Sequence, residues 1–276
     1  MSAAVFLGGG RITAALVAGL RTSGFRERIV VYDRHAEKLR ALGREFRVEA
    51  ARDARQAAGL AAQRGRNDAP SLLLIAVRPG DVLPLLASVG PLSRRTVVVS
   101  LVAGVSLRRL RQALGRRAEW TRAMPSPAAR AGLGLTALAF DHSMRPGSRR
   151  QVREFFGRVG TVLEIPERQF DAFTVVYSTS QGCEALRARI EAARRLGLDA
   201  RTAFVAAAHS LADGIRLLED NAHALPHALA EAATPGGIAA QVLEAMRAGG
   251  YERILERAFR KGLRRARESG RSQTRR

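Results

Sequence analysis

The first 165 residues alternate between short apolar runs and longer stretches with helical spacing of apolar and polar positions. The apolar runs are nearly continuous and rich in β-branched residues, which is typical of strands buried on both faces. They cover residues 4–8, 28–33, 71–77 and 96–102, with shorter candidates at 119–124, 135–140 and 161–165. Amphipathic stretches such as 14–24 and 106–115 separate them. This alternation predicts an α/β domain with a parallel sheet and crossover helices.

The strand pattern stops after Glu167, and the rest of the chain carries helical spacing. Segments 168–194, 200–220 and 238–267 are expected to be helical, because apolar residues recur there three or four positions apart. We therefore expect a nucleotide-binding α/β domain, an all-helical domain and a basic disordered tail. Their expected bounds are 1–165, 166–262 and 263–276.

The composition adds several exclusions. No run of eighteen apolar residues occurs, and the start MSAAVFLGGGR lacks the charged region of a signal peptide, so a cytoplasmic location and no membrane partner are expected. The single cysteine, Cys183, excludes internal disulfides and is expected to be a buried small apolar residue. The five histidines are scattered along the chain, and no metal site is expected.

The net charge of +21 raises the question of a nucleic-acid partner. Nearly all of the positive charge is arginine, since Lys38 and Lys261 are the only lysines, which indicates a bias across the whole chain. From Arg253 onward there are ten basic and two acidic residues, so eight of the twenty-one net charges lie near the C-terminus. We expect a basic arm that sticks loosely to RNA at low salt, and no specific nucleic-acid partner.

A glycine-rich turn, VFLGGGRITAAL, follows the first predicted strand. Gly8 and Gly10 fit the G-x-G-x-x-G pattern, in which a tight turn brings bare backbone to a pyrophosphate at the N-terminus of the next helix. Thr13 takes the place of the third glycine. The residues expected to bind a dinucleotide here are Gly8, Gly10, Arg11 and Ile12, with a purely structural turn as the alternative.

The second predicted strand ends in VYDRHAEKL, which carries opposing signals for the type of cofactor. A carboxylate at Asp33 would accept the ribose hydroxyls of NAD, whereas a guanidinium at Arg34 would hold the 2′-phosphate of NADP. We expect NADP, with Arg34 turned towards the phosphate and Asp33 turned away, and NAD stays open.

Three further loops follow predicted strands, at the edge where open α/β sheets bind ligands. In AVRPGDV the turn fixed by Pro79 is expected to line the nicotinamide ribose, and in SLVAGVS two small residues leave room for a ring. The loop RAMPSPAARAGLG is the third. The cofactor-binding residues expected in these loops are Ala76, Val77, Arg78, Pro79, Ala103, Gly104, Met124 and Pro125.

In this order and at these spacings, the motifs resemble those of the pyrroline-5-carboxylate reductase family. The resemblance covers most of the chain and extends to FDAFTVV (170–176) and TPGGIAA (234–240) in the helical part. It implies a Rossmann domain followed by a helical substrate and dimerisation domain. It also implies hydride transfer from NAD(P)H to a cyclic imine, giving proline.

The resemblance further implies which residues hold the substrate. In the family, the Pro-Gly-Gly turn opens a helix whose bare amides receive the substrate carboxylate, and helix N-termini bind anions in this way. Gly236 and Gly237 would allow that approach, and the hydroxyls of Thr179 and Thr234 would act at the catalytic centre. A plain helix break capped by Thr234 is the alternative. An iminium carries its own proton, so the site needs no separate acid.

Departures from the family pattern lie at the substrate end. Ile238 and Ala239 stand where the family has two threonines, Tyr177 stands where it has a serine, and MPSP is one residue shorter than the family's Met-Pro-Asn-Thr-Pro. Each lost hydrogen bond would weaken binding by roughly 0.5–1.5 kcal/mol. Two other functions stay open: an impaired family member that binds a dinucleotide and senses or scaffolds, and an NADPH-dependent reductase of a deazaflavin.

The helical part is too thin to bury all its apolar positions alone. Leucine and isoleucine side chains lie beside alanine-rich faces, which indicates a partner subunit. These residues are Leu211, Ile215, Leu217 and Leu218. We expect a homodimer or higher homo-oligomer formed through residues 168–260.

Overall fold

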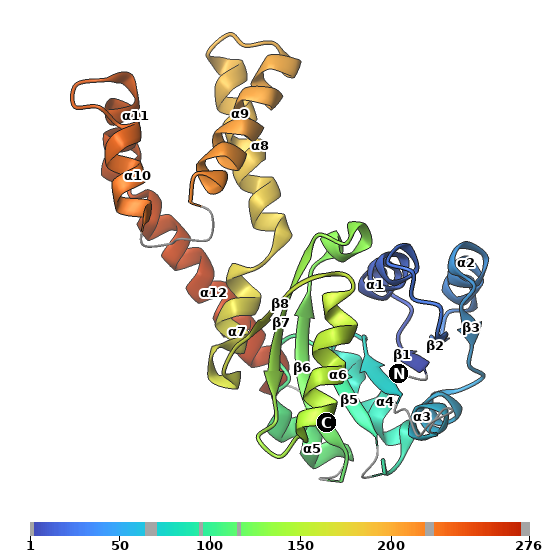
Figure 1. Cartoon of the computed structure of the whole chain (residues 1–276). Coiled ribbons are helices and arrows are strands. Elements are labelled where there is room, and N and C mark those ends of the chain that lie inside the picture. The colour runs from blue at the N-terminus through green and yellow to red at the C-terminus, as the bar shows by residue number, and fades with distance from the viewer. Residues whose placement is uncertain (1–2, 64–70, 94–95, 115–116, 219–223, 272–276) are drawn as a thin grey trace. The chain divides into compact units, whose positions relative to one another are not determined.

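The computed structural model describes residues 3–63, 71–93, 96–114, 117–218 and 224–271 (Figure 1). The chain forms two compact units. The first comprises Met1–Tyr177 together with Gly262–Arg276, and the second comprises Ser178–Lys261. The first unit extends beyond the boundary expected at 165–166, because helix α7 (Glu167–Val176) belongs to it.

One eight-stranded sheet forms the centre of the first unit, in the order β3-β2-β1-β4-β5-β6-β7-β8. The strands are β1 (Ala3–Leu7), β2 (Arg28–Tyr32), β3 (Glu49–Ala50), β4 (Leu72–Ile75), β5 (Val97–Ser100), β6 (Glu119–Pro125), β7 (Gly134–Phe140) and β8 (Gly160–Glu164). The strands up to β6 run parallel, β7 is antiparallel to β6, and β8 is parallel to β7. The predicted parallel sheet is confirmed, and the reversal at β7 is an addition that the sequence pattern did not indicate.

Strands β1, β2, β4 and β5 are apolar at almost every position because helices cover both faces of the sheet. Alternate residues of β1 enter different cores: Val5 and Leu7 lie in one, and Ala4 and Phe6 lie in the other. Helices α3 (Ala54–Ala62), α4 (Val82–Val89) and α5 (Leu107–Leu114) cover the first core, and α1 (Arg11–Thr22), α2 (Ala36–Phe46) and α6 (Pro146–Gly157) cover the second (Figure 1). The carboxyl ends of the parallel strands lie at one edge of this sheet.

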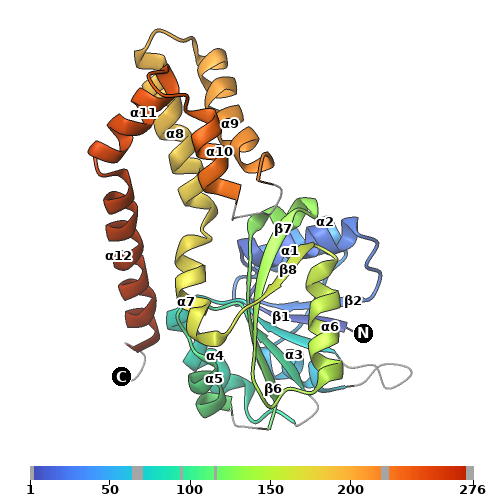
Figure 2. The same ribbon diagram turned by 60° about the vertical axis from the view of Figure 1, so that its left-hand side comes forward.

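The described residues of the second unit form helices. They are α8 (Thr179–Arg195), α9 (Ala200–Arg216), α10 (Leu225–Ala232), α11 (Ile238–Ala248) and the first part of α12 (Tyr251–Arg271). Helices α8 and α9 lie side by side (Figure 2). Asp199 begins α9, because its side chain accepts hydrogen bonds from the amides of Arg201 and Thr202.

The second unit buries very little apolar surface by itself. Ala203 and Ala207 are the buried apolar side chains among its described residues. Large apolar side chains such as Ile215, Leu217 and Val242 are instead exposed. An apolar surface of this kind needs cover from another chain, which agrees with the expected homo-oligomer.

Two of the expected helices are each divided in two. Segment 168–194 divides at Tyr177–Ser178 into α7 and α8, and segment 238–267 divides at Gly249–Gly250 into α11 and α12. Gly250 has a φ of 75°, which favours glycine and ends a helix readily. Helix α10 was not among the segments expected to be helical.

Helix α12 corrects the expected disordered tail. The helix continues to Arg271, so the tail predicted from residue 263 is wrong over 263–271, and residues 272–276 lie outside the described residues. Gly262 and Ala266 contact Val175 and Gly104, and these contacts give the end of α12 tertiary support. No helix in the described part of the chain is both long and apolar enough to cross a membrane.

Candidate active site

Gly8 follows β1 in a conformation that favours glycine. Its φ is 113°, and a Cβ atom there would overlap the carbonyl oxygen of Ala76, which follows β4. The Gly8 amide donates a hydrogen bond to the carbonyl of Tyr32 at the end of β2, at 2.7 Å. The turn is thus held between two neighbouring strands.

Gly10 precedes α1 and leaves the start of that helix bare. The cap position makes no side-chain hydrogen bond, and the first turn of the helix has no acidic residue. A Cβ atom at Gly10 would meet no atom within 4 Å, so packing within the chain does not explain this glycine. Uncapped amides such as those of Arg11 and Ile12 are of the kind that bind anions, and the binding of a pyrophosphate here stays a prediction.

Thr13 closes the turn where the pattern has its third glycine. Its buried Oγ1 donates to the Gly8 carbonyl at 2.6 Å. Close helix packing occurs instead at Gly19, where a Cβ atom would overlap the carbonyl oxygen of Ala129 in a short 3-10 helix (Pro127–Ala131). The sequence reasoning missed Gly19, although a glycine inside a helical pattern signals such a contact.

Asp33 turns inward, and the chain itself engages both of its carboxylate oxygens. One oxygen accepts from the Gly9 amide at 2.8 Å, and the other accepts from the His35 amide at 2.9 Å. The Nζ of Lys38 lies 3.4 Å from the carboxylate. Burial alone would raise the pKa of Asp33, yet the hydrogen bonds and the nearby ammonium hold that pKa below its ordinary value. Asp33 therefore braces the glycine turn as a carboxylate.

Cationic side chains project from the same loops. Arg34 is 66% exposed, and its Nη1 lies 3.5 Å from the Oδ1 of Asp81. Arg11 and Arg78 are exposed and have no ion-pair partner among the residues that the structure describes. The sequence reasoning found Arg34 but missed Lys38, because a lysine in the first turn of an amphipathic helix is an ordinary surface residue.

The remaining predicted cofactor residues follow β4, β5 and β6. The Ala76 amide donates to the Leu7 carbonyl at 2.8 Å, which places the loop Ala76–Pro79 beside the glycine turn. Met124 and Pro125 are the last two residues of β6, and Ala103 lies in the loop after β5. Because these strands are parallel, the structure brings the residues to one edge of the sheet.

Gly104 has a role that the sequence did not indicate. Its φ is 74°, and a Cβ atom there would overlap the carbonyl oxygen of Ala266 in α12. The small residue therefore admits the chain's own helix on that side. The sequence predicted that Gly104 leaves room for a nicotinamide ring, and this role stays a prediction.

A buried arginine links the end of β6 to α7. Arg122 is 1% exposed, and its Nη2 donates to Asp171 at 2.7 Å while its guanidinium lies 4.0 Å from the ring centre of Phe170. Glu167 lies 3.7 Å from the same guanidinium and accepts from the Leu107 amide at 2.6 Å. This cluster joins β6, α7 and the start of α5. The sequence reasoning missed it, although an arginine within an apolar strand is its signal.

The turn Thr234–Gly237 has the geometry needed for a bare helix start. Gly237 donates to the Thr234 carbonyl at 2.9 Å, and Gly236 has a φ of 75°, so Pro235 and Gly236 form the centre of a type II turn. Gly237 then precedes α11 without a side-chain cap, and the first turn of α11 has no acidic residue. The first amides of α11 are therefore open to an anion.

Thr179 is the first residue of α8, which starts the second unit. Thr179 and Thr234 are not joined by a hydrogen bond in the described residues. Tyr177 lies in the first unit, where its hydroxyl accepts a hydrogen bond from the Leu135 amide at 3.0 Å on β7. Cys183 is exposed, which corrects the expectation that it is buried, because α8 presents this face to solvent in the single chain.

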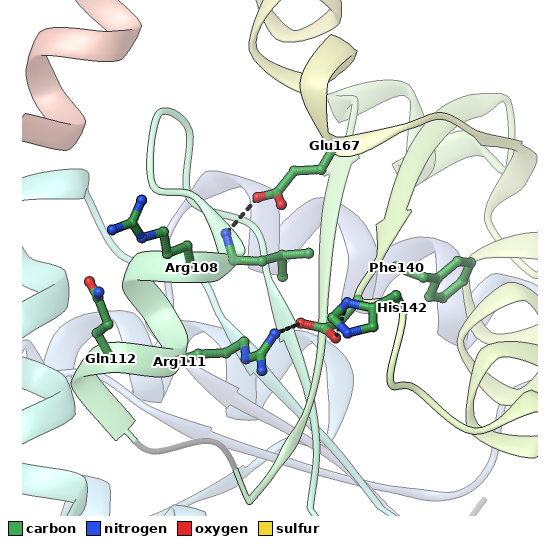
Figure 3. A pocket seen from close by; sticks show the side chains of 8 residues that line it. Arg108, Arg111, Gln112, Phe140, His142 and Glu167 are labelled. Carbon is green, nitrogen blue, oxygen red and sulfur yellow. Dashed lines mark hydrogen bonds and ion pairs between the residues drawn. The ribbon is translucent and has the colours of Figure 1, made fainter.

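A cavity of about 580 Å³ lies elsewhere in the first unit, beside α5 and the end of β7 (Figure 3). It is lined by Leu107, Arg108, Arg111, Gln112, Phe140, Asp141, His142 and Glu167. Arg111 points at Asp141 across a 2.7 Å ion pair. Burial alone would raise the pKa of Asp141, but hydrogen bonds from Ser143 and the charge of Arg111 lower it. None of the predicted site residues lines this cavity.

Two family models match the chain, one for each part. Residues 4–104 match the model described as NADP oxidoreductase, coenzyme F420-dependent, and residues 167–269 match the one described as pyrroline-5-carboxylate reductase dimerisation. Together with the sheet and the glycine turn, these matches define a class: oxidoreductases with a Rossmann domain for NADP and a helical dimerisation domain.

Comparison with known proteins defines the family. The pyrroline-5-carboxylate reductase of Thermus thermophilus is 30% identical over 273 residues, covering 97% of this chain and 98% of the relative. The Synechocystis sp. enzyme of the same name is 27% identical, covering 96% of this chain and 97% of the relative. The chain belongs to the pyrroline-5-carboxylate reductase family, as the sequence motifs predicted.

The fold is also that of solved members of the family. The Plasmodium falciparum pyrroline carboxylate reductase, solved with NADP bound, superposes with a TM-score of 0.84 at 15% identity, covering 98% of both chains. This likeness confirms the predicted fold class.

Proposed function

We propose that the protein is an NADPH-dependent reductase of a carboxylated cyclic imine, pyrroline-5-carboxylate or a close ring analogue. The observation that carries this proposal is a near full-length family match in a chain that keeps both glycine turns. Each turn leads into a helix with a bare N-terminus and no acidic residue in its first turn. The first turn suits the cofactor pyrophosphate and the second suits a substrate carboxylate.

The first unit fits NADP better than NAD. Asp33 has its oxygens engaged by Gly9 and His35, so it is poorly placed to accept ribose hydroxyls. Arg34 is exposed in the same loop, and Lys38, in the first turn of α2, adds a second positive charge. A phosphate dianion at the 2′ position would draw on both cations, whereas a ribose hydroxyl would not. NADP is the cofactor that the family matches also support.

Placement of the cofactor is assigned to four groups of residues. The amides of Arg11 and Ile12, reached across Gly8 and Gly10, hold the pyrophosphate. Arg34 holds the 2′-phosphate with Lys38, and Asp33 braces the turn. The loops Ala76–Pro79, Ala103–Gly104 and Met124–Pro125 flank the nicotinamide ribose and ring. When bound, NADPH supplies the hydride.

The second unit holds the substrate. The first amides of α11, exposed by Gly236 and Gly237, bind the carboxylate, and the hydroxyls of Thr179 and Thr234 orient the ring. The protonated imine brings its own proton, so these residues need only bind and aim the electrophilic carbon. Ile238 is 86% exposed and offers no hydroxyl at the site where the family has threonine, so we expect weaker turnover than the family pattern would give.

The direct test is oxidation of NADPH, followed at 340 nm, with pyrroline-5-carboxylate and with its six-membered ring analogue. Saturable turnover with either compound, and proline or its ring homologue as product, supports the proposal. A folded protein that binds NADPH but turns over neither compound would overturn it. That second outcome is the one expected of an impaired member that senses or scaffolds, for which the missing threonines at 238 and 239 are the motivating observation.

We further propose that the protein works as a homodimer or higher oligomer joined through residues 168–260. The match of residues 167–269 to a dimerisation model supports an oligomer, and so do the exposed apolar side chains of the second unit. Light scattering at micromolar concentration should give at least twice the chain mass of 29.8 kDa. A monomer under those conditions would contradict this arrangement.

A further inference from the structure

Helix α12 carries a row of positive charge on one side. At 100° per residue, Arg253, Arg257, Arg260, Lys261, Arg264 and Arg267 fall within an arc of about 120°. The row runs for roughly 21 Å along the helix axis. All six side chains are exposed in the single chain. Arg253, Arg257 and Arg260 belong to the segment proposed above to join the subunits, but they lie on the side of α12 opposite its apolar residues. We call it the basic stripe.

Few cations of the stripe are paired with a carboxylate, although the exposed Glu268 falls within the same arc. Arg260 pairs with Glu256, and no other cation of the stripe has a carboxylate partner among the residues that the structure describes. Elsewhere on the surface many arginines are paired, as in Arg28–Glu49 and Arg187–Glu184. A general excess of arginine would not by itself leave five unpaired cations in line on one helix.

In the second half of α12, the side opposite the stripe packs against the chain. Ala266 lies against Gly104, and Gly262 lies against Val175. Phe259 and Leu263 are half-buried, in contrast to the exposed cations of the stripe. An interfacial membrane helix would need its apolar side free to enter the bilayer, and in the second half of α12 that side is occupied. Ile254 and Leu255 in the first half are exposed, so binding to anionic vesicles is measured as well.

We propose that the basic stripe binds the phosphate backbone of nucleic acid without reading its sequence. Guanidinium groups match phosphate oxygens in a two-point geometry, and five of the six cations are arginine. The stripe contains no aromatic side chain, so it lacks a platform for stacked bases and contacts only the backbone. This property is independent of the reductase site and does not require its activity.

The test is fluorescence anisotropy of two unrelated 20-base-pair DNA duplexes, titrated with the full-length protein at several salt concentrations. Both duplexes should bind equally, with a dissociation constant on the order of micromolar that weakens steeply with salt. The stripe variant R253Q/R257Q/R264Q should weaken binding at least tenfold. It should also reduce the slope of log K against log salt by about 2 to 3, close to 0.9 for each removed contact.

The matched control is R44Q/R150Q/R195Q, which removes the same charge from exposed positions on α2, α6 and α8. It should change affinity by less than about twofold. Melting temperature and oligomer mass, measured for both variants, show that each is folded. Equal losses in stripe and control variants would overturn the proposal, as would the absence of binding by the wild-type protein. Binding to anionic vesicles but not to DNA would overturn it in favour of a membrane partner.

Discussion

The two glycine turns of this protein lead into similar helix starts but are held in different ways. The turn before α1 is buried and tied to distant parts of the chain through Tyr32, Asp33 and Ala76. The turn before α11 is exposed, and its hydrogen bond joins two of its own residues, Thr234 and Gly237. The turn proposed to bind the cofactor is therefore fixed by tertiary structure within one unit, whereas the turn proposed to bind the substrate depends on local backbone geometry.

This difference explains why the first glycine turn keeps the family pattern whereas residues beside the second turn depart from it. Substitutions in the buried turn would disturb two strands and a carboxylate network at once. Around the exposed turn, Ile238 and Ala239 replace threonines while the turn itself keeps its geometry. The comparison predicts that changes at the buried residues of the first turn act on stability and cofactor binding together, and that changes at the second turn act on substrate binding alone.

The largest expected effect is that of Gly8→Ala. The positive φ and the overlap with the Ala76 carbonyl should together reduce the free energy of unfolding by about 3 kcal/mol and abolish NADPH binding. Gly10→Ala is the matched control, because its Cβ atom meets open space. It should keep the wild-type melting temperature yet weaken NADPH binding. Equal melting temperatures for both variants would contradict this account of the first turn.

Arg34→Ala and Lys38→Ala test whether the first unit distinguishes NADPH from NADH. Each removes a charge-assisted contact to the 2′-phosphate, so the dissociation constant of NADPH should rise about 10- to 100-fold, with little change for NADH. Protein fluorescence titrations measure both constants. Arg40→Ala, on an exposed face of α2, is the control. A parallel loss of NADH and NADPH affinity would show that the two cations act on the fold and not on the phosphate.

Asp33→Asn tests the brace of the first turn through pH. The folded state holds the pKa of Asp33 below its ordinary value, so the carboxylate stabilises the fold above the unfolded pKa of about 4, and this contribution is lost as pH falls through the lower, folded pKa. The variant should be less stable than wild type by about 1–2 kcal/mol at neutral pH. The gap in melting temperature should close below about pH 4. A gap independent of pH would contradict the brace.

The smallest expected effects are those of Thr179→Val and Thr234→Val. Each removes one hydroxyl from the substrate and should lower kcat/KM by roughly 2- to 12-fold, equivalent to 0.5–1.5 kcal/mol. The dissociation constant of NADPH should not change, because both threonines lie in the second unit. Steady-state kinetics and cofactor titration on the same preparations separate these quantities. A change confined to NADPH affinity would contradict the assignment.

Much of the fold could be predicted from the sequence because buried parallel strands leave a strong local signal. The runs at 4–8, 28–33, 71–77 and 96–102 became β1, β2, β4 and β5. Breaks in the helical part were harder, since Tyr177–Ser178 carries neither proline nor glycine. The order of α12 beyond residue 263 depends on the contact between Ala266 and Gly104, which no local pattern reveals.

The residues of the candidate site also differ in how far the sequence could predict them. Gly8, Gly10 and the loops after the strands could be located because backbone chemistry restricts which residues fit there. The bracing role of Asp33 depends on Gly9, which is distant in sequence, so the chain alone could not indicate it. Lys38 is close to Asp33 in sequence but has the pattern of an ordinary surface residue of a helix. Arg122 left a signal, an arginine within an apolar strand, but its partner Asp171 could not be identified from the sequence. Gly104 was predicted to leave room for a nicotinamide ring, which stays a prediction, whereas its close contact with Ala266 could not be foreseen from the sequence.

The proposed substrate site requires the open amides of α11 to bind a carboxylate. Comparison of two substrates tests this requirement most directly. The kcat/KM for pyrroline-5-carboxylate should be measured with NADPH beside that for 1-pyrroline, the same ring without the acid group. We expect the carboxylated ring to be preferred by at least about 100-fold, in keeping with two or more charge-assisted hydrogen bonds of 1.5–3 kcal/mol each. Equal turnover of the two rings would contradict the claim.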